Sequence, residues 1–274
     1  MQNAIRRLAL CFFFVLRTLV SAERAIAPVT QQKIDEFMHL RMTLSVLDDR
    51  DKALARIREF EKDTVPLLRA AHGEQDALIL ENLIVSEVFN YYFDNPPISR
   101  DEFRKLLADQ KAKDDAYFDA HKGETFSEWF WATSGDVYSC WTTFSIKDIL
   151  LYGTTIKKYY LSAYEVNPQC SLALMALGQW YFQAPGVGGG SNKKARAYFE
   201  QARASSRNSA ETYFADIFFS QFLFEQKEFA AAKTLLDEAD SLNPNSAYIA
   251  LIRAQNENGV SLYQYNRKRS RYEK

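Results

Sequence analysis

The residues that could support catalysis are scattered along the chain. His39, His72 and His121 stand apart, and none belongs to an H-x-x-x-H or H-E-x-x-H arrangement, in which one helix face binds a metal. No G-x-S-x-G turn for a catalytic serine is present. The acidic pairs Asp48-Asp49 and Asp114-Asp115 are typical of solvated turn or helix carboxylates. The sequence therefore indicates no catalytic residues, no metal ligands and no cofactor.

A glycine-rich stretch is the most suggestive short motif. It runs from Gly186 to Lys194 and combines glycines with the start of a helix that carries lysines. Exposed amides and the positive end of a helix dipole can bind an anion. The residue order is not that of a P-loop, because G-x₄-G-K-[ST] is not matched. Ser191 would cap a helix that begins at Asn192, so the interpretations are a capped loop, which we favour, or an anion site.

Small and large residues recur at fixed spacing in the second half of the chain. A first helix has the spacing W-x₂-L-G-x₂-Y, with Leu in place of Trp, at Leu174, Leu177, Gly178 and Tyr181. A second-helix step with A-x₃-F spacing, followed by a small residue, occurs at Ala195, Phe199 and Ala202 and at Ala232, Leu236 and Ala239; the same spacing, with Ile in the first position, occurs at Ile156, Tyr160 and Ala163. Asn167-Pro168 and Asn243-Pro244 close two of these copies, since proline cannot continue a helix.

These motifs resemble those of the tetratricopeptide repeat (TPR) family over residues from about 154 to 250, roughly two and a half repeats. The resemblance implies stacked antiparallel helix pairs whose concave face holds a peptide, a partner protein or, less often, a small ligand. Ser220 and Leu223 depart from the pattern, where Gly and Tyr are expected, and the loop from Pro185 to Gly190 lengthens one turn.

Helix signals also fill the rest of the chain. Three pairs of residues have capping-box spacing, namely Ser99 and Glu102, Thr125 and Glu128, and Asn208 and Glu211. The segment from Gln75 to Phe93 is apolar nearly all round, which predicts a central helix. We expect an all-α protein of antiparallel helix pairs, α-solenoid-like, with TPR repeats in its C-terminal half. The expected divisions are a signal peptide at 1–22, a helical region at 23–153, the TPR-like repeats at 154–259 and a basic, solvated tail at 260–274.

The N-terminus has the features of a secretory signal. Arg6 and Arg7 precede the apolar run from Leu8 to Leu16, which is too short to cross a bilayer, and small residues follow ahead of Glu23. No later run is long enough for a membrane span, so we expect an exported protein, periplasmic in a bacterium, with no stable membrane insertion.

The composition limits the kinds of partner and site that we expect. The formal net charge is −1, which argues against nucleic acid, since phosphate binding requires a basic face. After removal of the signal peptide only Cys140 and Cys170 remain, and they could form a disulfide or serve as buried small hydrophobes. Trp129, Trp131, Trp141 and Trp180 could line an apolar pocket, although core packing is the interpretation that we favour.

The TPR resemblance also predicts a binding face. Its pattern places a set of aromatic and amide side chains in the concave groove, namely Gln179, Phe182, Gln183, Phe214, Gln221 and Phe224. Such side chains suit an extended peptide, whose backbone groups can pair with glutamine amides. In the alternative, these rings pack against N-terminal helices that fill the groove.

The function that we expect is therefore non-enzymatic binding of a partner protein or peptide by an exported TPR protein. The alternative is a binder of a small apolar ligand, because the architecture and export resemble those of the TPR T-components of periplasmic solute transporters. An enzyme is the third possibility, and it would require converging acids, histidines or a metal at one cleft.

Overall fold

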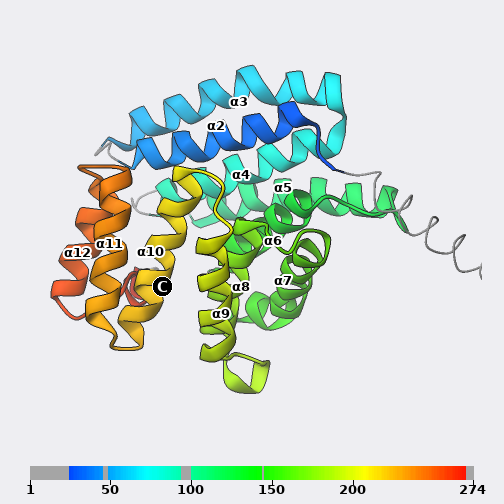
Figure 1. Cartoon of the computed structure of the whole chain (residues 1–274). Helices are drawn as coiled ribbons and strands as arrows, with labels where there is room; N and C mark the ends of the chain where they lie inside the picture. Colours follow the sequence, from blue (N-terminus) through cyan, green and yellow to red (C-terminus); the bar gives the residue numbers. More distant parts are fainter. Residues whose placement is uncertain (1–24, 46–48, 94–99, 144, 270–274) are drawn as a thin grey trace, which may run out of the picture.

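The computed structural model describes residues 25–45, 49–93, 100–143 and 145–269 (Figure 1). These described residues form twelve α-helices, one short 3₁₀ helix and no strand, so the all-α prediction is confirmed. The helices are α2 (Pro28–Leu44), α3 (Arg50–His72), α4 (Glu74–Phe93), α5 (Arg100–Ala120), α6 (Glu128–Thr142), α7 (Ile146–Val166), α8 (Ser171–Gln183), η1 (Gly186–Gly188), α9 (Asn192–Ala204), α10 (Ser209–Glu225), α11 (Phe229–Leu242), α12 (Ala247–Glu257) and α13 (Leu262–Arg269). The predicted signal peptide and Asp48 lie outside the described residues.

The helices form a stack of two layers. Neighbours in the chain pack as pairs, most extensively α6 with α7, α8 with α9, and α10 with α11. The first members, α4, α6, α8 and α10, also contact one another in succession, while α5, α7 and α9 each pack against the next first member (Figure 1). The chain is therefore α-solenoid-like, as predicted.

The recurring small-and-large step builds the contacts within and between these pairs. Every residue of the three copies is buried, with at most 6% of its surface exposed. A Cβ atom added to Gly178 in α8 would lie 2.8 Å from the ring of Phe199 in α9. In the preceding pair, a Cβ atom on Gly135 would lie 2.5 Å from the ring of Tyr160. Both contacts require a residue without a side chain on the first helix of the pair.

Predicted caps begin two of the helices, whereas α6 is capped by Ser127 and not by the predicted Thr125, and Ser99 lies outside the described residues. The Ser191 hydroxyl accepts a hydrogen bond from the amide of Lys194 at the start of α9, at 3.3 Å. The Asn208 side chain accepts one from the amide of Glu211 at the start of α10, at 3.0 Å. Each cap satisfies an amide that has no partner within its own helix.

Helix α2 crosses the starts of several first-layer helices instead of pairing only with α3. Side chains of α2, and that of Ser45 at its end, form hydrogen bonds or ion pairs with α4, with α6, with Arg207 two residues before α10 and with Ser246 directly before α12. The pairs are Thr30–Asp76 (2.5 Å), Gln31–Trp129 (3.0 Å), Asp35–Arg207 (3.0 Å) and Ser45–Ser246 (3.1 Å). Helix α2 therefore ties the first helix pairs to the last.

Two of the expected divisions can be compared with the helix bounds. Position 153, where the N-terminal region was expected to end, lies within α7. The first part of the predicted basic tail is α13, in which Leu262 and Tyr263 are buried. The amide of Leu262 donates to the side-chain oxygen of Gln221 at 2.9 Å, so this segment belongs to the folded stack.

The tryptophans lie at helix junctions. Trp129 is buried, and the Trp131 ring stacks on Phe118 at 4.8 Å between α5 and α6. Trp180 donates through Nε1 to the carbonyl of Gly153 at 3.1 Å, which joins α8 to α7. These contacts have the character of helix packing that we favoured from the sequence.

Candidate binding site

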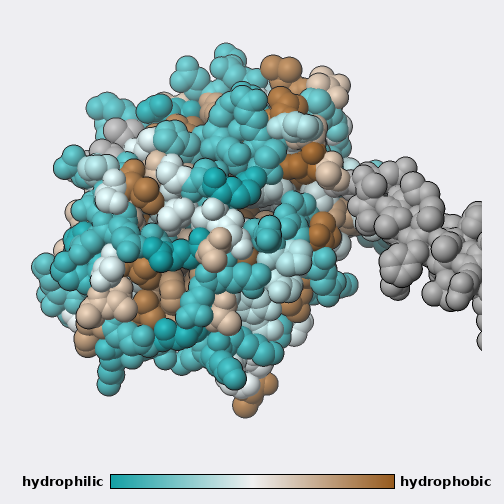
Figure 2. Space-filling model, viewed as in Figure 1, coloured by the Kyte–Doolittle hydropathy of each residue, from teal (hydrophilic) through white to brown (hydrophobic). Residues whose placement is uncertain are grey.

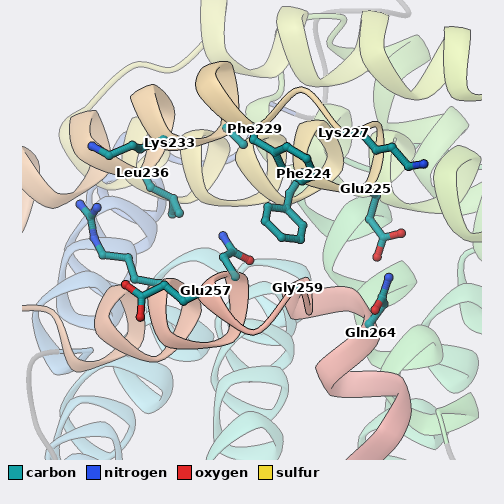
Figure 3. A pocket seen from close by; sticks show the side chains of 12 residues that line it. Phe224, Glu225, Lys227, Phe229, Lys233, Leu236, Glu257, Gly259 and Gln264 are labelled. Carbon is teal, nitrogen blue, oxygen red and sulfur yellow. The ribbon is translucent and has the colours of Figure 1, made fainter.

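A pocket opens between the α10–α11 pair and the α12–α13 pair (Figure 3). Its volume is about 570 Å³, which is within the range of ligand pockets in proteins. The lining residues are Phe224, Glu225, Lys227, Phe229, Ala232, Lys233, Leu236, Arg253, Asn256, Glu257, Gly259 and Gln264.

Aromatic and aliphatic side chains form one wall of the pocket. The Phe224 and Phe229 rings meet edge to face with their centroids 5.0 Å apart, and Leu236 lies farther along the same wall (Figure 3). Phe229 is the first residue of α11 and keeps 55% of its surface exposed. An exposed phenylalanine at the mouth of a pocket can be covered by a partner at little cost to the fold.

Two left-handed residues shape the ends of the helices that enclose the pocket. Lys227 follows α10 with φ of 65°, and Gly259 follows α12 with φ of 73°. A residue in this conformation ends a helix and turns the chain sharply. Phe229 and Gln264 are thereby brought to the opening between the two pairs.

The charged side chains of the rim are mostly paired. Arg253 binds Asp237 at 2.8 Å and Asp240 at 3.3 Å, and Lys233 binds Asp237 at 2.7 Å. Among the described residues, Lys227 forms no ion pair. The rim therefore presents mixed charge around an apolar wall, as protein interfaces do.

One polar atom in the pocket lacks a partner. The side-chain oxygen of Asn256 is buried and accepts no hydrogen bond from any described residue. Nearby, Ser261 donates to Glu225, whose carboxylate also lies 3.8 Å from Arg267. A buried acceptor without a donor destabilises a protein unless water or a ligand supplies the donor.

The six side chains of the predicted groove lie in different surroundings. Phe224 lines the pocket just described. Phe214 is buried beneath the guanidinium group of Arg41 from α2, at 4.7 Å, which is the packing against an N-terminal helix that the sequence left open. Gln221 is fully buried, and its side-chain oxygen accepts a hydrogen bond from the amide of Leu262, the first residue of α13.

The other three members of the set lie on α8. The Phe182 ring is half-buried against Phe222, at 5.4 Å, and Tyr263, at 5.1 Å. Gln179 is half-buried and Gln183 is exposed. Phe182 therefore contacts α10 and α13, and the pocket wall is made by Phe224 together with residues of α11.

The sequence did not single out Phe229, Leu236 or Asn256 as binding residues. The TPR pattern points to the first helices of the pairs, whereas this pocket lies between a second helix and the next pair. A usable signal was the phenylalanine at the start of α11, between the acid Glu228 and three alanines, where no large side chain follows it in the first turn.

A second pocket of about 640 Å³ lies between α3, α4 and α5. Its apolar wall includes Ile84, Val88 and Leu106, and Glu81 in its rim binds both Lys113 at 2.9 Å and Arg69 at 2.8 Å. Burial and the neighbouring Glu81 raise the pKa of Glu61. Glu81 is thus already paired within the protein, and a ligand that binds it would have to displace Arg69 or Lys113.

Asp114 is buried instead of solvated, which corrects the sequence expectation. It is fully buried between α4, α5 and α6, where Asn82 donates to Thr133 at 3.3 Å and Gln110 donates to Asn82 at 2.7 Å. Burial raises the pKa of Asp114 to about 8, although Ser134 and Asn82 lie close enough to oppose the rise. Neither carboxyl oxygen has a hydrogen bond of ordinary geometry, so the neutral form is favoured.

A further polar group lies where α2, α4 and α6 approach one another. Arg41 binds Glu87 at 2.8 Å, and the Tyr160 hydroxyl donates to Asp136 at 2.9 Å. Burial raises the pKa of Asp136 to about 6, opposed by the Tyr160 hydrogen bond and by Arg41. These groups satisfy one another and stabilise the junction of the first-layer helices.

The two cysteines of the described region are free thiols. Cys140 and Cys170 are not bonded to each other, and burial raises the pKa of both thiols to about 12, which keeps them protonated near neutral pH.

Within the described ranges, no three His, Cys, Asp or Glu side chains come together as metal ligands would. None of the described helices combines the length and apolar composition that a membrane span requires.

No family model matches the chain, and no curated protein matches it in sequence.

Proposed function

We propose that this protein is an exported, non-enzymatic helical-repeat protein of the TPR type that binds a segment of a partner protein. The binding site is the pocket between α10–α11 and α12–α13. Its apolar wall accepts a hydrophobic side chain of the partner, and its mixed-charge rim contacts the flanking residues.

The observation that carries this proposal is the unpaired oxygen of Asn256 beside an exposed aromatic wall. An extended peptide offers backbone N–H groups at regular intervals. One of them can donate to this oxygen when the Asn256 side chain turns from its covered position toward the pocket, while a neighbouring side chain contacts Phe224 and Phe229. A partner would thus cover the exposed ring and satisfy the buried acceptor at the same time.

The TPR assignment is supported by a contact that recurs in two helix pairs. Gly178 lies against Phe199, and Gly135 lies against Tyr160. The TPR pattern requires such a contact between a small residue on the first helix of a pair and a large residue on the second. Trp131, Gly135 and Tyr138 in α6 also have the W-x₃-G-x₂-Y spacing, which extends the repeat pattern one helix upstream. Export rests on the signal-like sequence at 1–22.

Selection from a phage-displayed random peptide library tests the proposal. Peptides that bind the wild-type protein should share an aliphatic or aromatic anchor, and they should be lost from a Phe229→Glu variant whose melting temperature is unchanged. Leu67→Glu is the matched control, since Leu67 is a similarly exposed apolar residue on α3. Enriched peptides that bind both variants equally would exclude this pocket as the site.

A small apolar ligand is the second candidate, favoured by the volume of about 570 Å³ and the apolar wall. Native mass spectrometry of the protein from its own host distinguishes the two. A bound small mass that is absent from the Phe229→Glu variant would favour the ligand, whereas co-purification of a polypeptide would favour the partner.

A further inference from the structure

We infer that one edge of the molecule, formed by the first two turns of α7 and the loop between α8 and α9, docks on the surface of an anionic lipid bilayer. This docking edge is distinct from the peptide pocket, and its function does not depend on that pocket.

The docking edge carries an unusual set of exposed aliphatic side chains. Their exposed fractions are 79% for Ile146, 47% for Ile149, 79% for Leu150, 59% for Leu151 and essentially complete for Val187. In Figure 1 the α8–α9 loop protrudes at the lower edge of the molecule, and in Figure 2 hydrophobic surface lies at its tip. Aliphatic groups that protrude this far can enter the boundary between lipid headgroups and chains.

Lysines accompany these aliphatic residues and have no acidic partners. Most basic side chains of the described region are in salt bridges, but the lysines around this edge form none with any described residue; they are Lys147, Lys157, Lys158, Lys193 and Lys194. Lys157 is held over the Trp180 ring at 4.4 Å, and both Lys157 and Lys194 lie near the Tyr181 ring, at 4.8 Å and 5.2 Å. Their charge is therefore available to anionic headgroups.

Helix α7 and the loop form one continuous surface. Leu150 and Lys157 are two turns apart on one face of α7, a separation of about 10 Å. The Nζ atom of Lys157 lies 3.6 Å from the position of a Cβ atom on Gly189, which places this lysine against the loop that carries Val187. The aliphatic groups of α7 and the loop that carries Val187 are thus joined through Lys157.

Both parts of the edge extend beyond the regular helix pairs. Helix α7 has 21 residues, whereas α9 and α11, its counterparts in the next pairs, have 13 and 14. The additional turns of α7 carry Ile146 to Leu151. The α8–α9 loop is longer than the turn after α10, and its amides bond within the loop: those of Gly188 and Gly190 donate to Pro185, and that of Gly189 donates to Gly186. An anion site made by these amides is thereby disfavoured, and the loop serves to present Val187.

The shape of the edge favours a bilayer over a peptide. None of the aliphatic or lysine residues lines either of the pockets described above. A peptide is bound in a concave site that encloses its anchor side chains. A protruding apolar tip on an edge that carries unpaired lysines instead matches a soft, negatively charged surface, into which it inserts without a preformed counterpart.

Co-sedimentation with vesicles tests the inference. The full chain should bind vesicles with about 30% phosphatidylglycerol more strongly than pure phosphatidylcholine, and salt should weaken the binding. Leu150→Glu, and separately Lys158→Glu combined with Lys193→Glu, should each lower the partition coefficient about tenfold or more. Every variant is made in the full chain, so residues 1–24 contribute equally to all of them.

Matched substitutions on α3 serve as controls. Leu67→Glu and Lys62→Glu alter an exposed apolar residue and an exposed lysine elsewhere and should leave vesicle binding unchanged. Equal binding of the wild type and the edge variants would overturn the inference. So would concentration-dependent dimerisation that Leu150→Glu abolishes, because the edge would then be an interface between copies of the chain.

Discussion

At the scale of single residues, the same residue type lies in opposite surroundings at different places in this fold. Gly178 faces the Phe199 ring across the α8–α9 contact, whereas a Cβ atom on Gly153 in α7 would meet nothing within 4 Å. The buried Asp114 and the exposed Asp119 of α5 form a similar contrast. Each contrast supplies a substitution with its own control.

Alanine at the two glycines should shift stability in opposite directions. Gly178→Ala should lower the free energy of unfolding by about 1–3 kcal/mol, because the added methyl group overlaps a fully buried ring. Gly153→Ala should raise it by up to about 1 kcal/mol, since alanine favours the helix and the space is open. Urea unfolding measures both, and equal effects would contradict the packing described for α8 and α9.

Asp114 makes stability depend on pH. Its pKa in the folded state is raised to about 8, so between about pH 4 and pH 8 the unfolded chain releases a proton that the folded protein retains. Stability should therefore fall as pH rises through this window, by at most about 1.4 kcal/mol per unit, with no penalty below it.

Asp114→Asn should remove that loss, so the variant should gain stability relative to the wild type from pH 5 to pH 8. Asp119→Asn changes an exposed carboxylate on the same helix and should leave the pH profile nearly unaltered. Parallel profiles for the wild type and Asp114→Asn would show that the buried carboxyl group titrates normally.

At the scale of secondary-structure elements, the contacts of α2 hold the stack together. The Ser45 hydroxyl, at the end of α2, lies 2.9 Å from the Tyr213 hydroxyl, 3.1 Å from Ser246 and 2.9 Å from the Asn243 amide nitrogen. The backbone carbonyl of Ser45 also accepts from the amide of Tyr248 at 3.3 Å. One serine therefore joins the N-terminal helix to α10 and to the turn between α11 and α12.

Ser45→Ala should destabilise the protein by about 1–2 kcal/mol, because it removes the hydroxyl that bonds Tyr213, Ser246 and Asn243. Tyr213 and Ser246 still bond each other, and Asn243 still donates to the Met42 carbonyl, so the loss is that of hydrogen bonds and not of every partner. Hydrogen exchange of the backbone amides of α12 should also be faster in this variant than in the wild type. Ser241→Ala, which removes a hydroxyl bonded only within α11, is the control and should change neither quantity appreciably. If α12 exchanged at the wild-type rate in Ser45→Ala, the junction would be less important than the geometry indicates.

The elements differ in how far the sequence predicted them. The helix pairs followed from local signals: the caps Ser191 and Asn208, and the alternation of Ala195, Phe199 and Ala202. The position of α2 could not be predicted, because its partners lie up to about 200 residues away and its polar contacts have no periodic signature. The burial of Asp114 was missed for the same reason, since a carboxylate next to another acid gives no local sign of its surroundings.

At the scale of the whole molecule, the two candidate sites lie in different regions. The peptide pocket lies where α11 faces the following helix pair, and the docking edge lies where α7 and the α8–α9 loop outgrow the pairs. The TPR pattern predicted Phe224 as a binding residue, but it could not predict Phe229 or Asn256, because the opening depends on how two successive pairs are spaced. The regular repeat therefore builds the scaffold, and departures from regularity supply the sites.

The most direct test of the central proposal is to measure two properties of an Asn256→Ala variant, its free energy of unfolding and its affinity for a peptide selected against the wild type. The unpaired buried oxygen costs stability in the free protein, so its removal should leave the free energy of unfolding unchanged or raise it by about 1 kcal/mol. The same change should weaken the peptide about tenfold, since the bound backbone amide loses its acceptor. A variant that binds the peptide as tightly as the wild type, or that loses stability and affinity together, would contradict the assignment of this pocket as the partner site.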